Sequence, residues 1–263
     1  MPGPGKIIAV VNQKGGVGKT TTAVNLASAL GLTGVRTLLV DADAQGNATS
    51  GFGINRRELE RCVYDVLMAP PDGDLKDLIE ATVVKTAVGG VDILPATINL
   101  AGAEVTLATA IARETKLRRA LAVAAKSYEI ILIDTGPSLG LLTINALAAA
   151  DSVLVPIQCE YYALEGLSQL LDVIHLVQGQ INPRLAIEGV VLTMYDGRTS
   201  LSRAVAKEVR RHFRGRVFTV TIPRNVRLAE APSQGLPGIL YDPQSRGARA
   251  YVNLAREVFQ HST

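Results

Sequence analysis

A glycine-rich segment near the start of the chain holds the residue types that bind polyphosphates. Residues 14–21 read Lys-Gly-Gly-Val-Gly-Lys-Thr-Thr and follow directly on the apolar run 7–11. This order predicts a strand, a loop and the first turn of a helix, which together aim backbone N–H groups at one point in space. In that arrangement Lys19 reaches the β- and γ-phosphates of a nucleotide, and the Thr20 hydroxyl is a ligand of Mg²⁺. The predicted nucleotide-binding residues are therefore Lys14, Gly15, Gly16, Val17, Gly18, Lys19, Thr20 and Thr21.

One position departs from the common loop template G-x-x-x-x-G-K-[ST]. The template has glycine where this chain has Gln13, and an additional lysine, Lys14, follows it. A second cation beside a phosphate site that already holds Lys19 has no obvious purpose unless it serves another nucleotide. The alternative is a glycine-rich loop that only joins a strand to a helix, but the patterns on both sides of the loop favour phosphate binding.

Three aspartates stand where predicted strands end, which is where ligands bind in parallel sheets. Asp41 and Asp43 follow the apolar run 37–40, and Asp134 follows the run 130–133. At the end of such a strand, Asp134 would hold Mg²⁺ directly or through water. A strand-end aspartate is common in α/β proteins, so the assignment of Asp134 to Mg²⁺ depends on the phosphate loop upstream. The alternative for Asp41 and Asp43 is that they cap a turn.

The last quarter of the chain concentrates positive charge. Residues 198–257 contain 12 Lys and Arg against 4 Asp and Glu, whereas the rest contains 15 against 20, for a net charge of +3. At about 100° per residue, five cations of a predicted helix fall within an arc of roughly 100°. The chain has no Trp and 4% aromatic residues, so this face suits the phosphates of duplex DNA better than stacking on single strands. A solvated basic face is the alternative. The cations are Arg203, Lys207, Arg210, Arg211 and Arg214, opposite Leu201, Val205, Val209 and Phe213.

Apolar strand-like runs alternate with helical patterns along the whole chain. Several runs are apolar at nearly every position, as in strands that are covered on both faces of a parallel sheet. The alternation predicts an α/β fold with a mostly parallel, doubly wound sheet flanked by helices, in a single domain over residues 1–263. The expected strands are 7–11, 37–40, 91–94, 130–133, 152–157, 187–193 and 217–222, and the expected helices are 19–30, 104–125, 139–148, 166–178 and 201–213.

Length and composition exclude several classes of protein. With 263 residues, of which 48% are hydrophobic, the chain can bury a large core and is not a disordered protein. No apolar run approaches the roughly 20 residues that span a bilayer, and the residues before the first strand leave no room for a signal peptide. Cys62 and Cys159 lie far apart without C-x-x-C spacing, which predicts neither a disulfide nor a zinc site. The expected location is the cytoplasm.

The phosphate loop with its extra lysine, the strand-end aspartates and two further motifs together resemble the deviant-Walker ATPases, and among them the ParA/Soj chromosome-partitioning family. The further motifs are Gln-Cys-Glu-Tyr-Tyr at residues 158–162 and Ile-Pro-Arg-Asn-Val-Arg at residues 222–227. The resemblance covers nearly the whole chain, from about residue 6 to about residue 257. It implies a P-loop NTPase fold of the deviant Walker type and an ATPase that is slow without its partner. It also implies a homodimer formed on Mg·ATP, binding to double-stranded DNA without sequence preference, stimulation by a ParB-like protein and association with the nucleoid.

The resemblance also implies roles for single residues. Lys14 would cross the dimer interface to the partner's phosphates, and Asp43 would position the attacking water. Asp41 would act on the metal indirectly, through its direct ligands. Pro223 and Asn225 would border the adenine base. The DNA contacts of the family fall on Arg198 and Arg227, with Arg203, Lys207, Arg210, Arg211, Arg214 and Arg224 as further candidates.

Two positions depart from the pattern of the family. Ala44 and Gly136 stand where family members usually have proline, which puts the rigidity of both loops in question. These departures keep open a second function, a nucleotide-switch scaffold with negligible hydrolysis. A measurement of turnover with and without DNA would separate that scaffold from an enzyme.

Two other classes share the phosphate loop. A MinD-like membrane-cycling ATPase needs an amphipathic C-terminal helix, and the ending 256–263 is predicted to be too short and too polar for one, so no membrane partner is expected. A metallocluster reductase or maturase needs paired cysteines, and Cys62 and Cys159 do not have such spacing. Larger plasmid relatives carry an N-terminal DNA-binding extension. With six residues before the first predicted strand, DNA binding is expected on the ATPase domain itself.

Overall fold

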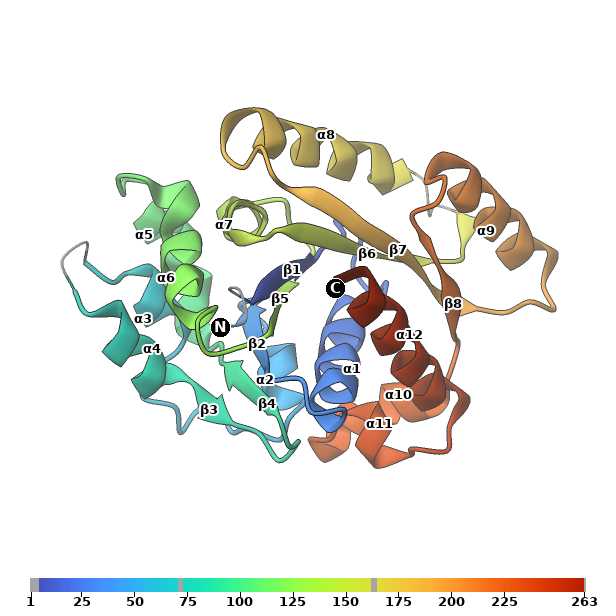
Figure 1. Ribbon diagram of the computed structural model, residues 1–263, viewed down its shortest axis with the longest axis horizontal. Helices are drawn as coiled ribbons and strands as arrows, with labels where there is room; N and C mark the ends of the chain where they lie inside the picture. The colour runs from blue at the N-terminus through green and yellow to red at the C-terminus, as the bar shows by residue number, and fades with distance from the viewer. Residues whose placement is uncertain (1–4, 71–72, 162–164, 263) are drawn as a thin grey trace.

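A sheet of eight strands runs through the computed structural model, which describes residues 5–70, 73–161 and 165–262 (Figure 1). The strand order is β3-β4-β2-β5-β1-β6-β7-β8, and every neighbouring pair is parallel except β3 with β4. This confirms the predicted α/β fold with a mostly parallel sheet. The strands are β1 (Lys6–Val10), β2 (Thr37–Ala42), β3 (Val84–Lys85), β4 (Val91–Leu94), β5 (Ile130–Thr135), β6 (Ser152–Gln158), β7 (Ala186–Tyr195) and β8 (Val217–Pro223).

Helices cover both faces of the sheet (Figure 1), and two separate buried clusters show which helices lie on which side. One face packs against α1 (Lys19–Leu32), α2 (Asn47–Ser50), α10 (Val226–Glu230), α11 (Gly238–Tyr241) and α12 (Arg246–Ser262). The other face packs against α3 (Val63–Leu67), α4 (Leu75–Thr82), α5 (Ala103–Leu107), α6 (Lys116–Ala124), α7 (Leu141–Ala149), α8 (Glu165–Gln180) and α9 (Ser200–His212).

Strand β1 lies in the middle of the sheet and shows why both faces must be covered. Its residues Ile7 and Ala9 join one buried cluster, whereas Ile8 and Val10 join the other. All four side chains are buried. Successive side chains of a strand point to opposite faces, so an uninterrupted apolar run is what a strand covered on both faces requires.

The register of the central strands brings the chemically important residues to one edge of the sheet. Asp41 of β2 and Asp134 of β5 are register partners, and Val10, the last residue of β1, also pairs with Asp134. Parallel strands end at the same edge, so the loops after β1, β2, β5, β7 and β8 all leave the sheet there. The fold therefore gathers the phosphate loop, the aspartates and the two arginine-bearing loops along a common edge.

The single helix expected over residues 104–125 is wrong, because two helices stand there. Helix α5 ends at Leu107 and α6 begins at Lys116. Between them, Ala112 has a φ of 53°, in the left-handed region that a right-handed helix does not include. Apolar periodicity reports the buried faces of both helices and does not detect a break between them.

The ending 256–263 is predicted to be too short and too polar for a membrane-binding amphipathic helix, but its described residues are part of a longer helix. The ending belongs to α12, a helix of 17 residues. Its apolar side, which includes Tyr251, Leu254 and Val258, is buried against α1 and β8. The helix thus completes one layer of the core. No helix in the described ranges combines the length and the apolar character needed to cross a membrane.

Candidate active site

The phosphate loop is held in shape by glycines at its tightest points. Gly16 and Gly18 have φ values of 75° and 87°, which favour glycine because a Cβ atom would clash with the backbone. The N–H of Thr22 then donates to the carbonyl oxygen of Gly18 at 2.8 Å and starts the hydrogen-bond ladder of α1. The open N–H groups of the first turn point toward the loop, where an anion can accept from them.

Lys19, the first residue of α1, is a buried cation at the centre of this loop. It is 7% exposed, and its Nζ donates to the carbonyl oxygen of Lys14 at 2.9 Å. Burial lowers the pKa of Lys19, while the charges of Asp134 and Asp43 oppose that shift. The ammonium group is therefore desolvated and faces carboxylates from two strand ends, as expected of a group that meets a polyanion.

Asp41 and Asp134 form a pair of buried carboxylates beneath the loop. Both are fully buried. Asp41 Oδ2 accepts from the N–H of Thr49 at 2.8 Å and from its hydroxyl at 2.7 Å, yet burial still raises the pKa of Asp41 to about 6. Burial, and then the charge of Asp41, raise the pKa of Asp134 well above its usual range. Two desolvated carboxylates side by side need positive charge to stay ionised.

The surroundings of Asp134 fit a bound cation. Neither of its carboxylate oxygens has a hydrogen-bond partner of good geometry among the described residues, although the Thr20 hydroxyl lies near enough to favour the charged form. In the described part of the chain, no three His, Cys, Asp or Glu side chains are placed to hold a metal ion together. A cation here would therefore draw on one carboxylate, the Thr20 hydroxyl, water and phosphate oxygens. Mg²⁺ is bound in this manner in many nucleotide sites.

Asp43 stands at the rim of the same site and is in contact with the loop after β5. Its N–H donates to Asp41 Oδ1 at 3.3 Å, and its own Oδ1 accepts from the N–H of Gln45 at 3.0 Å. A Cβ atom built on Gly136 would lie 3.2 Å from Oδ1 of Asp43. The glycine at this position therefore lets the carboxylate lie close against the backbone of the neighbouring loop.

Lys19, Thr20 and Asp43 line a cavity of about 340 Å³. Most residues predicted from the phosphate loop line it, together with Asp43. Val17 does not, because its side chain is buried and its carbonyl oxygen accepts from the Thr193 hydroxyl at 2.8 Å. Sequence reasoning missed four of the lining residues, which are Gln45, Asn47, Pro137 and Met194. The lining is Gly15, Gly16, Gly18, Lys19, Thr20, Thr21, Asp43, Gln45, Asn47, Pro137 and Met194.

A second cavity of about 300 Å³ adjoins the first, and Gly18, Thr21 and Met194 line both. Pro223 and Asn225 line it, as the adenine prediction requires. Asn225 Oδ1 accepts from the N–H of Arg227 at 2.8 Å and caps α10. Its amide N–H₂ group is thus the part that could meet a base edge. The remaining lining is Thr193, Ile222, Arg224, Val226, Leu228, Ala229 and Tyr251.

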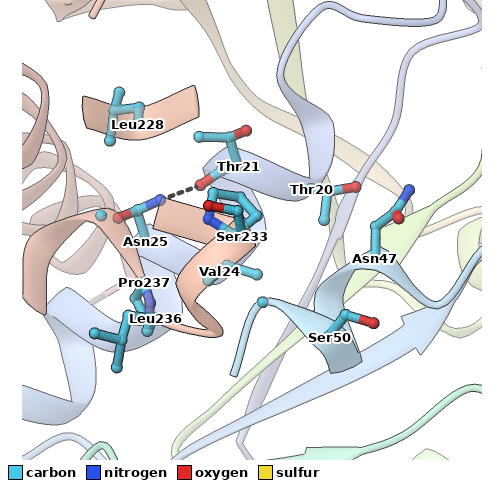
Figure 2. A pocket seen from close by; sticks show the side chains of 13 residues that line it. Thr20, Thr21, Val24, Asn25, Asn47, Ser50, Leu228, Ser233, Leu236 and Pro237 are labelled. Atoms are coloured by element: carbon cyan, nitrogen blue, oxygen red, sulfur yellow. Dashed lines mark hydrogen bonds between the residues drawn. The ribbon is translucent and has the colours of Figure 1, made fainter. Parts of the chain in front are cut away.

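A third hollow, of about 460 Å³, lies on the other side of the start of α1. Figure 2 shows Thr20 and Thr21 of α1 on one wall, Asn47 and Ser50 of α2 on another, and Leu228 of α10 across from them. Helix α11, whose first residue Gly238 lines this hollow, is held against α1 through Asn25. Its Nδ2 donates to the Thr21 carbonyl oxygen at 2.8 Å, and its Oδ1 accepts from the N–H of Ile239 at 3.0 Å.

Lys14 points away from the phosphate cavity within its own chain. Its Nζ forms an ion pair with a carboxylate oxygen of Glu160, which follows the end of β6. Its N–H donates to Asn12 Oδ1 at 2.9 Å. The structure therefore does not place Lys14 with Lys19 around one nucleotide. Of the neighbouring Gln-Cys-Glu-Tyr-Tyr motif, Tyr162 lies outside the described residues.

Helix α9 carries the predicted basic face. It buries Ser202, Val205, Ala206 and Val209. Leu201, predicted to pack on the core, is instead 45% exposed. The reason is that Ser202 takes the core-facing position of the first turn, where its hydroxyl donates to the Cys159 carbonyl oxygen at 3.3 Å.

The two arginines predicted to contact DNA already have carboxylate partners. Arg198 donates to both carboxylate oxygens of Asp196, at 2.9 and 2.8 Å, and this contact lowers the pKa of Asp196 to about 2. Arg227 donates to Glu230 at 2.9 Å, and its Nε lies 3.5 Å from a carboxylate oxygen of Asp242. The Arg198 side chain is 90% exposed. A phosphate at this edge would meet exposed guanidinium groups but would compete with these carboxylates.

Among the further candidates, Arg203 donates to the Gly197 carbonyl oxygen at 2.7 Å and Arg211 to Glu208 at 2.5 Å. The other four have no ion pair with a described residue in the structure. These are Lys207, Arg210, Arg214 and Arg224.

Known proteins resemble this chain along most of its length. The model of a family described as an AAA domain matches residues 5–187, which include the phosphate loop and all three strand-end aspartates. Sporulation initiation inhibitor protein Soj of Bacillus subtilis (strain 168) is 59% identical over 254 residues, which are 97% of this chain and 98% of that protein. Chromosome partitioning protein ParA of Caulobacter vibrioides is 52% identical over 257 residues, covering 97% of this chain and 94% of that one.

A solved structure shows the same fold. It is described as cobyrinic acid a,c-diamide synthase from Mycobacterium smegmatis with a bound ATP analogue and magnesium. Its TM-score against this chain is 0.84 at 39% sequence identity, and the match covers 98% of this chain and 95% of that one. A protein with nearly the same backbone thus holds the two ligands that the cavity and the buried carboxylates described here would suit.

Proposed function

The chain belongs to the ParA/Soj family of chromosome-partitioning ATPases, and we propose that its Mg·ATP-bound form is a homodimer that binds double-stranded DNA without sequence preference. A ParB-like protein stimulates hydrolysis, which is slow without it. The protein acts at the nucleoid in the cytoplasm, and residues 1–263 work as one ATPase domain. Its general role is that of its relatives, an ATPase of chromosome partitioning.

One observation carries the nucleotide part of this proposal. The buried cation Lys19 lines a cavity of about 340 Å³ and interacts with the charges of Asp134 and Asp43. Lys19 would contact the β- and γ-phosphates, while Thr20 and Asp134 would hold Mg²⁺ with Asp41 behind them. Bound there, Mg²⁺ would supply positive charge both to the phosphates and to the carboxylates that lack it.

Asp43 is the residue that we assign to the attacking water. Its carboxylate lines the cavity at the same edge as Lys19, and one of its oxygens is already fixed by the N–H of Gln45. A fixed acceptor at this place can orient a water molecule toward the γ-phosphate. The absence of a side chain at Gly136 leaves room for this carboxylate beside the loop after β5.

Lys14 would act on the nucleotide of the second protomer. A lysine inserted from the partner can neutralise charge that develops on the γ-phosphoryl group. Within its own chain this lysine forms an ion pair with Glu160. On dimerisation the ammonium group would exchange Glu160 for phosphate oxygens.

We expect Lys14→Ala to spare ATP binding and to abolish ATP-dependent dimerisation, because the residue is directed away from the cavity of its own chain. Light scattering with saturating Mg·ATP measures this. Glu160→Gln is the matched control, since it breaks the same ion pair while keeping the lysine, and it should still dimerise. A Lys14→Ala protein that dimerises with ATP as the wild type does would refute the assignment.

The DNA part of the proposal is supported by the basic loops and helix at the carboxyl edge of the sheet. Arg198 follows β7 and Arg227 follows β8, and these strands are paired near their ends through Tyr195 and Pro223. Guanidinium groups at a common edge suit the spaced phosphates of a duplex. A dimer would offer two such edges to one DNA molecule, which raises affinity without any new kind of contact.

Arg198→Glu and Arg227→Glu are each expected to weaken DNA binding by at least about tenfold and to reduce the slope of log affinity against log salt by about 1 per lost contact. ATP binding and dimerisation should stay as in the wild type. Titration of fluorescent duplex DNA with Mg·ATP measures both effects.

Arg184→Glu provides the control for these variants, because it makes the same charge change on an exposed residue before β7, at the opposite edge of the sheet. Equal weakening by Arg184→Glu would mean that net charge alone governs binding. Unchanged DNA affinity in both Arg198→Glu and Arg227→Glu would mean that the basic face is only a solvated surface.

The MinD-like alternative receives no support from α12. A membrane-cycling ATPase would present the apolar side of its terminal helix to lipid, whereas here Tyr251, Leu254 and Val258 are buried against α1 and β8. Turnover measured with and without DNA distinguishes the proposed enzyme from a nucleotide-switch scaffold. Stimulation by DNA and a ParB-like partner is the expected result for the enzyme.

A further inference from the structure

Met194, near the end of β7, has a backbone conformation that its side chain disfavours. Its φ is 49°, and Met194 and Ala112 are the two non-glycine residues with positive φ in the part of the chain that the structure describes. The strand is irregular at the same place. Between its pairings with Thr221 and Pro223 of β8, β7 advances three residues while β8 advances two. Met194 therefore lies in a β-bulge, a device that redirects the side chains that follow it.

The bulge lies where the two cavities of the candidate nucleotide site adjoin each other. Met194 lines the phosphate cavity together with Lys19 and Asp43, and it also lines the adenine cavity together with Pro223 and Asn225. A nucleotide that fills both cavities would touch this residue from two sides. Strained backbone is found at functional sites more often than elsewhere, because the surrounding structure must hold it in place.

The residues on either side of the bulge connect it to both proposed functions. Immediately before it, the Thr193 hydroxyl donates to the carbonyl oxygen of Val17 in the phosphate loop at 2.8 Å. Two residues after it, Asp196 holds the guanidinium of Arg198 through two hydrogen bonds. The N–H of Thr199 donates to the Asp196 carbonyl oxygen at 3.1 Å, and the Thr199 hydroxyl caps α9.

A short path, made of one hydrogen bond and then of the chain itself, thus runs from Val17 of the phosphate loop through Thr193 and the strained Met194 to Arg198 and the start of α9. We propose that Met194 is a positioning residue whose bulge couples nucleotide binding to DNA binding, by setting where Arg198 and the start of α9 stand relative to the phosphate loop. This inference rests on the proposed function and adds to it the element that would transmit the nucleotide signal.

The proposed coupling needs a second conformation of this segment, and extended backbone at Met194 would provide it. A return of Met194 to extended backbone would remove the extra residue from β7 and shift the residues after it by one position. Since successive strand residues point to opposite faces, the shift would move the turn that holds Arg198. A nucleotide in contact with Met194 would favour one of the two conformations, as a ligand must if it is to shift an equilibrium.

The test is the ratio of DNA affinity with ATP to that with ADP, each nucleotide at a saturating concentration set by the variant's own affinity. Met194→Gly accepts both backbone conformations without strain, so its ratio should fall about tenfold below that of the wild type. Met194→Ala also shortens the side chain that lines both cavities but keeps a Cβ atom and hence the strain, so its ratio should fall much less than that of Met194→Gly. Ala112→Gly relieves the same kind of strain far from the nucleotide cavities and should change nothing.

Each other outcome overturns the inference in a recognisable way. An equal fall in Met194→Gly and Met194→Ala would assign the effect to side-chain contact and not to the backbone. A fall in Ala112→Gly would show a general effect of flexibility. A wild-type ratio that is retained in Met194→Gly would remove Met194 from the coupling while leaving the proposed function intact. A wild-type ratio of one would instead refute the proposed function, and the coupling with it.

Discussion

Replacing Lys19 with alanine is expected to abolish ATP binding and to leave the fold intact. In the structure its Nζ is bonded to a loop carbonyl and faces the carboxylates of Asp134 and Asp43. Without this cation the β- and γ-phosphates would meet those carboxylates unscreened. Hydrogen bonds to charged groups contribute about 1.5–3 kcal/mol each, so each lost contact should weaken affinity by about tenfold to a hundredfold, and the loss of more than one contact together with the repulsion should abolish binding.

Calorimetric titration with Mg·ATP measures this loss, and circular dichroism checks that the variant is folded. Lys76→Ala is a suitable control because Lys76 lies exposed on α4, away from the loop, and should bind ATP normally. A folded Lys19→Ala protein with wild-type affinity for ATP would show that the glycine-rich loop is not the phosphate site.

Asp43→Ala should lower ATP turnover by about a hundredfold or more while ATP binding and dimerisation persist. The substitution removes the acceptor proposed to orient the attacking water but leaves Lys19, Thr20 and Asp134 in place. The variant should accumulate as an ATP-bound dimer on DNA, because the step that ends this state is slowed.

Phosphate release, measured beside DNA binding in the same samples, reports both halves of that expectation. Asp172→Ala, an exposed aspartate of α8, is the matched control and should hydrolyse ATP as the wild type does. If Asp43→Ala hydrolyses ATP as fast as the wild type, then Asp43 only caps a turn and another residue orients the attacking water.

The parts of the fold that the sequence predicts well are those with strong local patterns. The apolar runs that became β1, β2 and β5 are buried on both faces, and a strand in that position tolerates little else. The phosphate loop was also predictable, because glycines at positive φ followed by Lys19 and Thr20 leave few other conformations. In both cases the residues that decide the structure are neighbours in the chain.

The parts that escaped prediction depend on contacts between distant segments. Tyr251 of α12 lines the cavity that also holds Pro223 and Asn225, and its hydroxyl lies 3.1 Å from that of Thr22, 229 residues earlier in the sequence. The ion pair between Lys14 and Glu160 likewise joins residues that only the sheet brings together. The carboxylate partner of Arg198, Asp196, lies two residues away in sequence, but a count of cations does not show which of them are already paired.

The central claim is that ATP, and not ADP, turns this protein into a DNA-binding dimer, and a DNA titration of the wild-type protein tests it most directly. Affinity for an arbitrary duplex would be measured with Mg·ATP and with Mg·ADP at two salt concentrations. We expect tight binding with ATP only, little dependence on DNA sequence, and a steep loss of affinity with salt at about −0.9 per phosphate neutralised. Equal affinity with ADP, or binding that does not respond to salt, would contradict the account.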